Sequence, residues 1–208
     1  MRHATFGLGV LFIIIAGCCT HQTNYVLPKD VPVVPQHPIK TCLPGLVNFG
    51  VVSKDVLRGA TPSREGFQTL ANLGVKTVIH LGETDETKSI PAGMKYVRLP
   101  ISAFRSPYVN VYAVLRAIRD NPKPVYICCY TGADRTGVAV AAYRLSQGMS
   151  VADSMAEVWY FYVKPWFYLP IKWRLYELQK EGLSPTWWES NGIRPTPART
   201  LSSTTQSD

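Results

Sequence analysis

Two kinds of apolar spacing alternate along the middle of the chain. Short, nearly continuous apolar runs, typical of buried strands, occur at residues 46–60, 75–81, 95–101 and 125–129. Between them, apolar residues recur every three or four positions, as on one face of a helix, at residues 62–74, 109–122 and 137–148. This alternation predicts an α/β fold with a central, mostly parallel twisted sheet flanked by helices.

Polar caps, glycines and prolines indicate where the helices begin and end. Ser63 is placed to cap the first helix and Gly74 to end it. Ser150 is expected to cap a later helix, and Pro170 to begin the last one, which ends at Gly182. In sheets of this class, ligands bind beyond the carboxyl ends of the parallel strands. The loop that follows the run at 125–129 is therefore a candidate site.

The first residues are typical of a secretory signal. Their apolar run at residues 8–16 follows Arg2 and is shorter than the about 20 residues of a membrane-spanning helix. The run ends in Ile-Ala-Gly before Cys18, which resembles the lipobox of bacterial lipoproteins. The resemblance implies a signal peptide at residues 1–17 and lipid attachment at Cys18. It also implies a bacterial cell-envelope location, on the periplasmic side of the outer membrane in preference to the inner membrane. An ordinary signal peptide or a short uncleaved anchor is the alternative.

Composition divides the rest of the chain into three parts. Residues 18–44 are rich in proline, which favours an extended tether over a helix or a central strand. Residues 45–184 carry the strand and helix patterns and are predicted to form one domain. Residues 185–208 lack periodicity, so we expect a partly disordered tail in which Trp187 and Trp188 could pack on the domain.

Charge and cysteine content limit the classes of partner and cofactor that the chain is expected to bind. The formal net charge is +8, but the basic residues are scattered and form no dense run, so no nucleic-acid partner is expected. The charge better suits an anionic substrate or an anionic membrane surface. The four histidines are isolated and no zinc-binding spacing exists, so neither a metal nor an organic cofactor is expected. A disulfide between Cys19 and Cys42 is conceivable in an oxidising compartment. The oligomeric state stays open.

The loop in VYICCYTGADRTGVAVAAYRL, residues 125–145, has the composition of an anion cradle. Backbone N–H groups at a strand-to-helix turn favour a bound dianion, and Gly132 lets the backbone curl closely around it. The same donors, together with Arg135, favour the thiolate form of Cys129, and the planar guanidinium suits two oxygens of one phosphate. Thr136 could donate to the sulfur. These features predict thiolate attack on a phosphoryl group, then hydrolysis of the cysteinyl-phosphate.

The stretch CYTGADRTG, residues 129–137, matches the C-x5-R-[ST] signature of cysteine-dependent protein tyrosine and dual-specificity phosphatases, and resembles their bacterial, atypical branch. Residues 56–82 are similar to the opening of that branch, and the likeness spans about residues 46–182. It implies a phosphatase acting on phosphotyrosine-, phosphoserine- or phosphothreonine-type monoesters. Cys129 would be the nucleophile, Arg135 the phosphate clamp, Thr136 the assistant to the sulfur and Asp134 the candidate general acid. The backbone of the loop would hold the phosphate at Tyr130, Thr131, Gly132, Ala133, Asp134 and Arg135.

Two positions depart from the family pattern. Cys128 stands where the family usually has a histidine that supports the loop, and a thiol is only a weak hydrogen-bond donor. The loop at residues 102–110, where the general acid is usually an aspartate, has no carboxylate. Asp134 is the best substitute, although it could equally be a structural cap or a substrate contact. Asp85 and Glu86 are poorer candidates.

Several alternatives stay open at this stage. The chain could be a catalytically weak phosphate-binding module, or a phosphatase of inositides or lipid phosphates. A thiol redox role for Cys128 and Cys129 is less compatible with their adjacency, because thioredoxin-like sites separate the cysteines by two residues. Arg58 could touch the phosphate site or form a buried ion pair. The aromatic run at residues 158–168 is expected in the core, or else as an apolar rim for a lipid or aromatic substrate.

Overall fold

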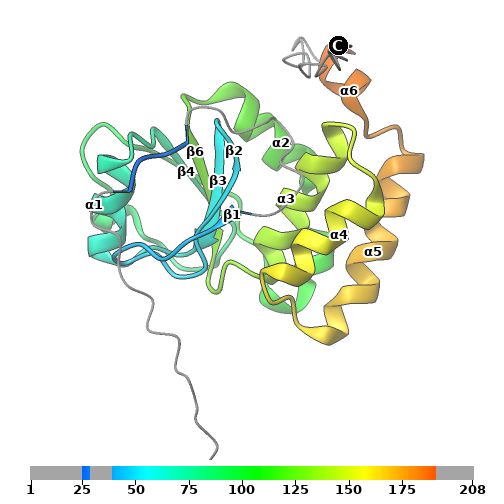
Figure 1. Ribbon diagram of the computed structural model, residues 1–208, viewed down its shortest axis with the longest axis horizontal. Helices are drawn as coiled ribbons and strands as arrows, with labels where there is room; N and C mark the ends of the chain where they lie inside the picture. The colour runs from blue at the N-terminus through cyan, green and yellow to red at the C-terminus, as the bar shows by residue number, and fades with distance from the viewer. Residues whose placement is uncertain (1–24, 29–38, 191–208) are drawn as a thin grey trace, which may run out of the picture.

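The computed structural model describes residues 25–28 and 39–190. The signal peptide expected at 1–17, the lipid site expected at Cys18 and most of the expected tether lie outside the described residues. A six-stranded sheet, in the order β1-β2-β3-β6-β4-β5, forms the centre (Figure 1). The strands are β1 (Ile39–Lys40), β2 (Gly50–Ser53), β3 (Val56–Ala60), β4 (Thr77–His80), β5 (Lys95–Arg98) and β6 (Val125–Cys129).

The sheet is parallel where it carries the candidate loop. Strands β3, β6, β4 and β5 are mutually parallel, whereas β1 and β2 extend one edge in the antiparallel sense. The apolar run at 46–60 forms the β2–β3 hairpin, in agreement with the two short strands that its pattern predicts. The predicted α/β fold with a mostly parallel sheet is therefore confirmed, and β6 lies between β3 and β4, with its C-terminal end flanked on both sides.

Helices cover both faces of this sheet (Figure 1). Helix α1 packs on one face, where Phe67 and Leu70 join the apolar cluster that contains Leu57 and Tyr126. The larger cluster on the other face includes buried side chains of α2, α3, α4 and α5. The helices are α1 (Arg64–Asn72), α2 (Val111–Asp120), α3 (Asp134–Ser146), α4 (Val151–Tyr160), α5 (Pro165–Lys180) and α6 (Pro185–Ser190), with 3-10 turns η1 (Thr87–Ser89) and η2 (Ala103–Tyr108).

The helix ends follow the sequence signals with one exception. Ser63 and Ser150 cap α1 and α4 as predicted, because each hydroxyl accepts a backbone N–H three residues along. The expected start of the last helix at Pro170 is wrong, since α5 begins at Pro165. Pro165 already occupies the first helical position, where its missing N–H costs nothing. Pro170 lies inside the helix, which its buried face holds in place.

The segments at the two ends of the domain are also partly ordered. Cys42, at the end of the expected tether, is disulfide-bonded, whereas Cys19, the partner considered above, lies outside the described residues. The beginning of the expected tail forms α6, and Trp187 packs against Tyr112 with 5.8 Å between ring centroids. Over the described ranges, none of the helices combines the length and apolar character needed to cross a bilayer.

Candidate active site

The candidate loop lies at the carboxyl end of β6, as expected for a ligand site in a parallel sheet. Cys129 is the last residue of β6, and α3 begins at Asp134, so four residues make the turn. The carbonyl of Cys129 accepts hydrogen bonds from the backbone N–H groups of Thr61 at 2.7 Å and Gly132 at 3.3 Å. The second of these bonds folds the loop back over the end of its own strand.

Two backbone segments approach each other so closely at position 132 that only glycine fits there. Its φ of +69° lies in the left-handed region. A Cβ at this position would lie 2.3 Å from the backbone carbon of Gly59 and 2.4 Å from the nitrogen of Ala60. The loop therefore packs against the end of β3 without any side chain between them. Tyr126 supports β3 at the same place, because its hydroxyl donates to the Ala60 carbonyl at 2.7 Å.

Cys128 and Cys129 lie on opposite faces of the sheet, as strand alternation requires. Both thiols are free and buried. Cys128 belongs to the cluster under α1, and Cys129 to the cluster that contains α3. Burial raises the pKa of the Cys128 thiol well above its usual value, and the charges of Cys129 and Glu86 add to this effect. Cys128 is thus an inert core residue, which argues against a redox pair.

Two neighbouring residues contact the Arg135 side chain. Its side chain is almost fully buried, and Nη1 donates to the Ile101 carbonyl at 2.8 Å. The same nitrogen lies 4.0 Å from Oε2 of Glu83, a largely exposed carboxylate on the loop after β4. The structure thus adds Glu83, which the sequence pattern does not single out, to the neighbourhood of the candidate phosphate clamp.

Thr136 differs from its expected role in one respect. Its hydroxyl is buried, and no hydrogen-bond partner for it exists in the part of the chain that the structure describes. The predicted donation to the Cys129 sulfur is therefore not formed. An unpaired buried hydroxyl is unfavourable by about 1–3 kcal/mol, so this group is an available donor in the first turn of α3.

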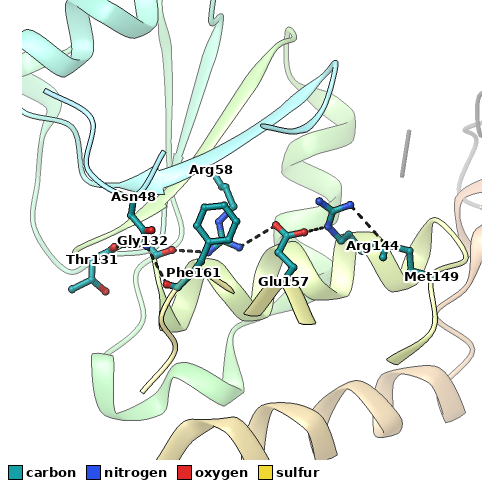
Figure 2. A network of polar contacts seen from close by, with 8 residues as sticks. All are labelled: Asn48, Arg58, Thr131, Gly132, Arg144, Met149, Glu157 and Phe161. Carbon is teal, nitrogen blue, oxygen red and sulfur yellow. Dashed lines mark hydrogen bonds and ion pairs between the residues drawn. The ribbon is translucent and has the colours of Figure 1, made fainter. Parts of the chain in front are cut away.

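A buried network of side chains from β3, α3 and α4 supports the loop (Figure 2). Nη2 of Arg58 donates to the Gly132 carbonyl at 2.7 Å, and Nη1 forms an ion pair with Glu157 Oε1 at 3.2 Å. Glu157 also pairs with Arg144, so one carboxylate of α4 bridges two guanidinium groups. The Arg58 guanidinium lies 3.8 Å from the centre of the Phe161 ring. Arg58 thus makes the buried ion pair considered above and also binds the loop.

Asn48 fixes the outer part of the same loop. Its side-chain amide donates to the carbonyls of Thr131 and Phe161, both at 3.2 Å. The residue has a φ of +56°, an unusual value for a residue other than glycine. Figure 2 shows Asn48 and Arg58 on either side of the Gly132 backbone, which ties the loop to the N-terminal hairpin and to the end of α4.

Arg58 places a second positive charge behind the loop. Burial lowers the pKa of its guanidinium from 12.5 to about 9, and the neighbouring Cys129 and Tyr126 partly oppose this shift. With a pKa of about 9, Arg58 remains protonated at neutral pH. The thiolate form of Cys129 therefore faces a charged guanidinium from β3, in addition to the backbone donors of the loop.

The candidate acids occupy different environments. Asp134 is buried, and both of its carboxylate oxygens contact Lys164: Oδ1 accepts the backbone N–H at 2.9 Å and Oδ2 lies 3.4 Å from Nζ. Asp85 is exposed, and hydrogen bonds from Thr87 lower the pKa of its carboxyl. For Asp134, these contacts fit the structural cap considered above. In the described chain, no contact joins Asp134 or Asp85 to Cys129.

Two cavities share Lys40 and Tyr162 in their walls, and one of them, of about 680 Å³, is also lined by Trp159 and Tyr160. The other cavity, of about 550 Å³, adjoins the outer side of the loop, where Thr131, Ala133 and Asp134 form one wall and Lys40 and Lys164 contribute positive charge. Among residues 25–28 and 39–190, no group of three or more histidine, cysteine or carboxylate side chains could hold a metal ion.

Comparisons with known proteins agree with this geometry. A model of the family PTP-NADK, described as "DSP-PTPase phosphatase fused to NAD+ Kinase", matches residues 51–162. Dual specificity protein phosphatase TpbA of Pseudomonas aeruginosa is 31% identical over 102 residues, which are 48% of this chain and 47% of that protein. The OCA1 protein of Eremothecium gossypii is 28% identical over 146 residues, 62% of this chain and 64% of that protein. The chain thus spans less than two thirds of the length of either relative.

Solved structures show the same fold. The crystal structure of P. aeruginosa TpbA has a TM-score of 0.55 at 23% identity and covers 67% of this chain and 94% of that chain. The crystal structure of PTPMT1 has a TM-score of 0.50 at 20% identity and covers 64% of this chain and 98% of that one. The family match runs from β2 to just beyond α4 and includes the whole candidate loop. With just over half of its residues matched, the chain belongs to the PTP-NADK family of dual-specificity-type phosphatases.

Proposed function

We propose that the chain hydrolyses phosphate monoesters through a cysteinyl-phosphate intermediate. The observation that carries the proposal is the turn from Cys129 to Arg135, folded back over β6 by the Gly132–Cys129 hydrogen bond and held from behind by Arg58. Its backbone N–H groups and two guanidinium groups supply a preorganised environment for a phosphoryl dianion. Family membership supports the same chemistry.

The proposed reaction has two displacements at phosphorus. The Cys129 thiolate forms an S–P bond while the ester P–O bond breaks, and the departing alcohol or phenol oxygen takes a proton. Water then attacks the phosphorus and loses a proton to the solvent, the S–P bond breaks, inorganic phosphate is released and the thiolate is regenerated. Arg135 and the loop N–H groups bind the equatorial oxygens in both steps, where charge is spread over them. Thr136, with its unpaired hydroxyl, stabilises the sulfur as it departs.

As substrates, we propose protein phosphate monoesters, with phosphotyrosine preferred. A phenolate is a good leaving group and depends less on a general acid, and both carboxylate oxygens of Asp134 already contact Lys164. The name of the relative TpbA, a dual specificity protein phosphatase, supports this class. Inositol phosphates and lipid phosphates are the competing substrates, and a phosphate-release screen across all three classes separates them.

The test of the activity is p-nitrophenyl phosphate hydrolysis by the wild type and by Cys129→Ser. We expect the substitution to abolish turnover while inorganic phosphate still protects the loop from proteolysis. Equal rates in the two proteins would contradict the enzymatic role and leave the chain a phosphate-binding module.

We also propose that Cys18 carries a lipid anchor in the cell envelope, on the basis of its lipobox-like context alone. Labelling with a radioactive fatty acid, in the wild type and in Cys18→Ala, tests this. Labelling that persists in the variant would contradict it.

A further inference from the structure

Helix α5 has two apolar faces, of which only one is buried. Ile171, Leu175 and Leu178 recur at helical spacing and are fully buried against the domain. The opposite face carries a second series at the same spacing, which we name the outer stripe: Trp166, Leu169, Trp173 and Tyr176. Their exposed fractions are 67%, 61%, 69% and 40%. Figure 1 shows α5 on the outside of the molecule, where α3 and α4 separate it from the sheet.

Exposed aromatic side chains also gather at the end of α4 and in the loop that follows it. Trp159, Tyr160 and Tyr162 are also largely exposed, and Trp159 contacts Tyr168 of α5 edge-to-face with 5.6 Å between centroids. The aromatic run at 158–168 is thus only partly core: Val158, Phe161 and Val163 are buried, whereas its other large side chains reach the surface. Contiguous exposed apolar surface of this kind marks an interaction site.

The charges beside the outer stripe are mainly positive. Lys164, Lys172 and Lys180 lie before, beside and at the end of the stripe. The carboxylates of α5, on Glu177 and Glu181, both pair with Arg174, so their charge is offset, although Glu177 lies one turn from Trp173. The chain as a whole carries a formal charge of +8. The partner of this face should therefore have a negatively charged surface with an apolar layer just beneath it.

We propose that the outer stripe docks on the surface of an anionic lipid bilayer. Tryptophan and tyrosine prefer the boundary between headgroups and acyl chains, and lysines beside them bind anionic headgroups. A second copy of the chain is the less suitable occupant, because a two-fold interface through this face would bring the lysines of both copies together.

Docking through this face would bring the candidate active site to the lipid surface. Lys164, which binds Asp134 in the loop, has its ammonium 5.9 Å from the centre of the Trp166 ring, at the start of the outer stripe. On the α4 side, Lys40 of β1 has its ammonium 4.0 Å from the centre of the Tyr162 ring.

Vesicle co-sedimentation tests the proposal. The protein is the full chain with Cys18→Ala, which removes any acyl anchor, and the vesicles are phosphatidylcholine alone or mixed with phosphatidylglycerol. We expect binding to the mixed vesicles only, weakened by salt, with a blue shift of tryptophan fluorescence. Trp166→Ser/Trp173→Ser should reduce binding at least tenfold and leave p-nitrophenyl phosphate hydrolysis unchanged.

Two charge variants distinguish the effect of lysines at the outer stripe on vesicle binding from the effect of the net charge of the protein. Lys172→Glu/Lys180→Glu should weaken vesicle binding by about 25-fold or more, since each basic side chain near an anionic surface contributes about fivefold. Arg64→Glu/Lys76→Glu makes the same charge change at exposed positions on the α1 side and should bind nearly as well as the parent chain. Equal loss in the two variants, absence of binding to mixed vesicles, or a dimer that Trp166→Ser/Trp173→Ser dissociates would each overturn the proposal.

Discussion

Arg58, at the centre of β3, donates a hydrogen bond of 2.7 Å to the carbonyl of Gly132, at the tip of the candidate phosphate loop. Seventy-four positions separate the two residues in the sequence. Because Arg58 holds this carbonyl, the partial negative charge of its oxygen is directed at a guanidinium and does not oppose a bound anion. The bond therefore orients the loop as well as stabilising it.

Arg58→Lys should lower kcat/KM for p-nitrophenyl phosphate by about 10- to 100-fold. A lysine keeps the positive charge but lacks the planar fork that reaches both Gly132 and Glu157, and a hydrogen bond to a charged group contributes about 1.5–3 kcal/mol. Inhibition by inorganic phosphate should weaken in parallel. Arg64→Lys, at an exposed position in α1, is the control and should change neither quantity. A folded Arg58→Lys protein with wild-type kinetics would show that Asn48 alone is enough to hold the loop.

Gly132→Ala should abolish activity, whereas Gly93→Ala should not. Both glycines have a positive φ, +69° and +83°, so each alanine costs roughly 1–2 kcal/mol in backbone energy. Only at Gly132 would the new Cβ meet backbone atoms, at 2.3 Å, because the space around Gly93 is open. Measurements of thermal unfolding and turnover for the two variants therefore separate two free-energy costs: that of placing alanine at a positive φ and that of displacing the loop. Similar losses in both would refute the close-packing argument.

Cys128→Ala should retain most of the activity, in contrast to a Cys129 substitution. The Cys128 side chain points into the cluster under α1, on the opposite face from Cys129, so its removal leaves a small cavity that costs about 1–2 kcal/mol. Iodoacetamide should modify Cys129 in the folded protein and Cys128 only after unfolding, because burial raises the pKa of Cys128. Rapid alkylation of Cys128 in the native protein, read by peptide mass spectrometry, would contradict this assignment.

The sequence predicts those features of the fold that depend on local pattern. The alternation of apolar runs places β6, α3 and the loop between them correctly, and the spacing from Cys129 to Arg135 locates the candidate site. Strand alternation also separates Cys128 from Cys129. These are consequences of neighbouring residues, which a single chain displays directly.

Contacts between distant segments are not visible in the same way. Asn48 and Glu157 both help to hold the loop, yet neither lies in a recognisable motif, because their roles arise only when the hairpin and α4 pack beside β6. Pro170 suggests a helix start that the structure does not have, for a related reason. A proline destabilises the helix interior locally, but the burial that outweighs this cost comes from tertiary packing. The outer stripe of α5 likewise has the spacing of a core face, and only the structure shows which apolar face is exposed.

Asp134→Asn distinguishes a structural carboxylate from a general acid. Because Lys164 contacts both oxygens, we expect equal, modest losses of kcat with p-nitrophenyl phosphate and with an alkyl phosphate. A general acid would give a different result: loss of its proton matters little for a good leaving group and costs about 10²–10⁴-fold for a poor one. A selective loss with the alkyl phosphate would therefore identify Asp134 as the acid. Lys164→Met, which removes the ammonium but keeps the backbone donor, serves as the matched variant.

Stability should fall as the solution is acidified through the range in which His80 titrates. Burial lowers the pKa of His80 below its usual value of 6.5, Arg135 and Arg98 lower it further, and Glu86 and Asp85 partly oppose the shift. The unfolded chain therefore binds a proton near pH 6.5 that the folded protein rejects. The contribution of His80 is fully present above this pH, and it is lost as the pH falls toward the folded-state pKa.

Thermal unfolding from about pH 7.5 to about pH 5.5 measures this loss. The melting temperature of the wild type should fall more steeply than that of His80→Gln, which cannot titrate. Tyr96→Phe removes the partner of Nδ1, which lies 2.7 Å from the Tyr96 hydroxyl, but leaves the imidazole buried, so the steep dependence should persist in that variant. Asp85 and Asp120 titrate below this window, because hydrogen bonds hold the pKa of each carboxyl under 3.8. Parallel curves for the wild type and His80→Gln would therefore mean that His80 does not control acid stability.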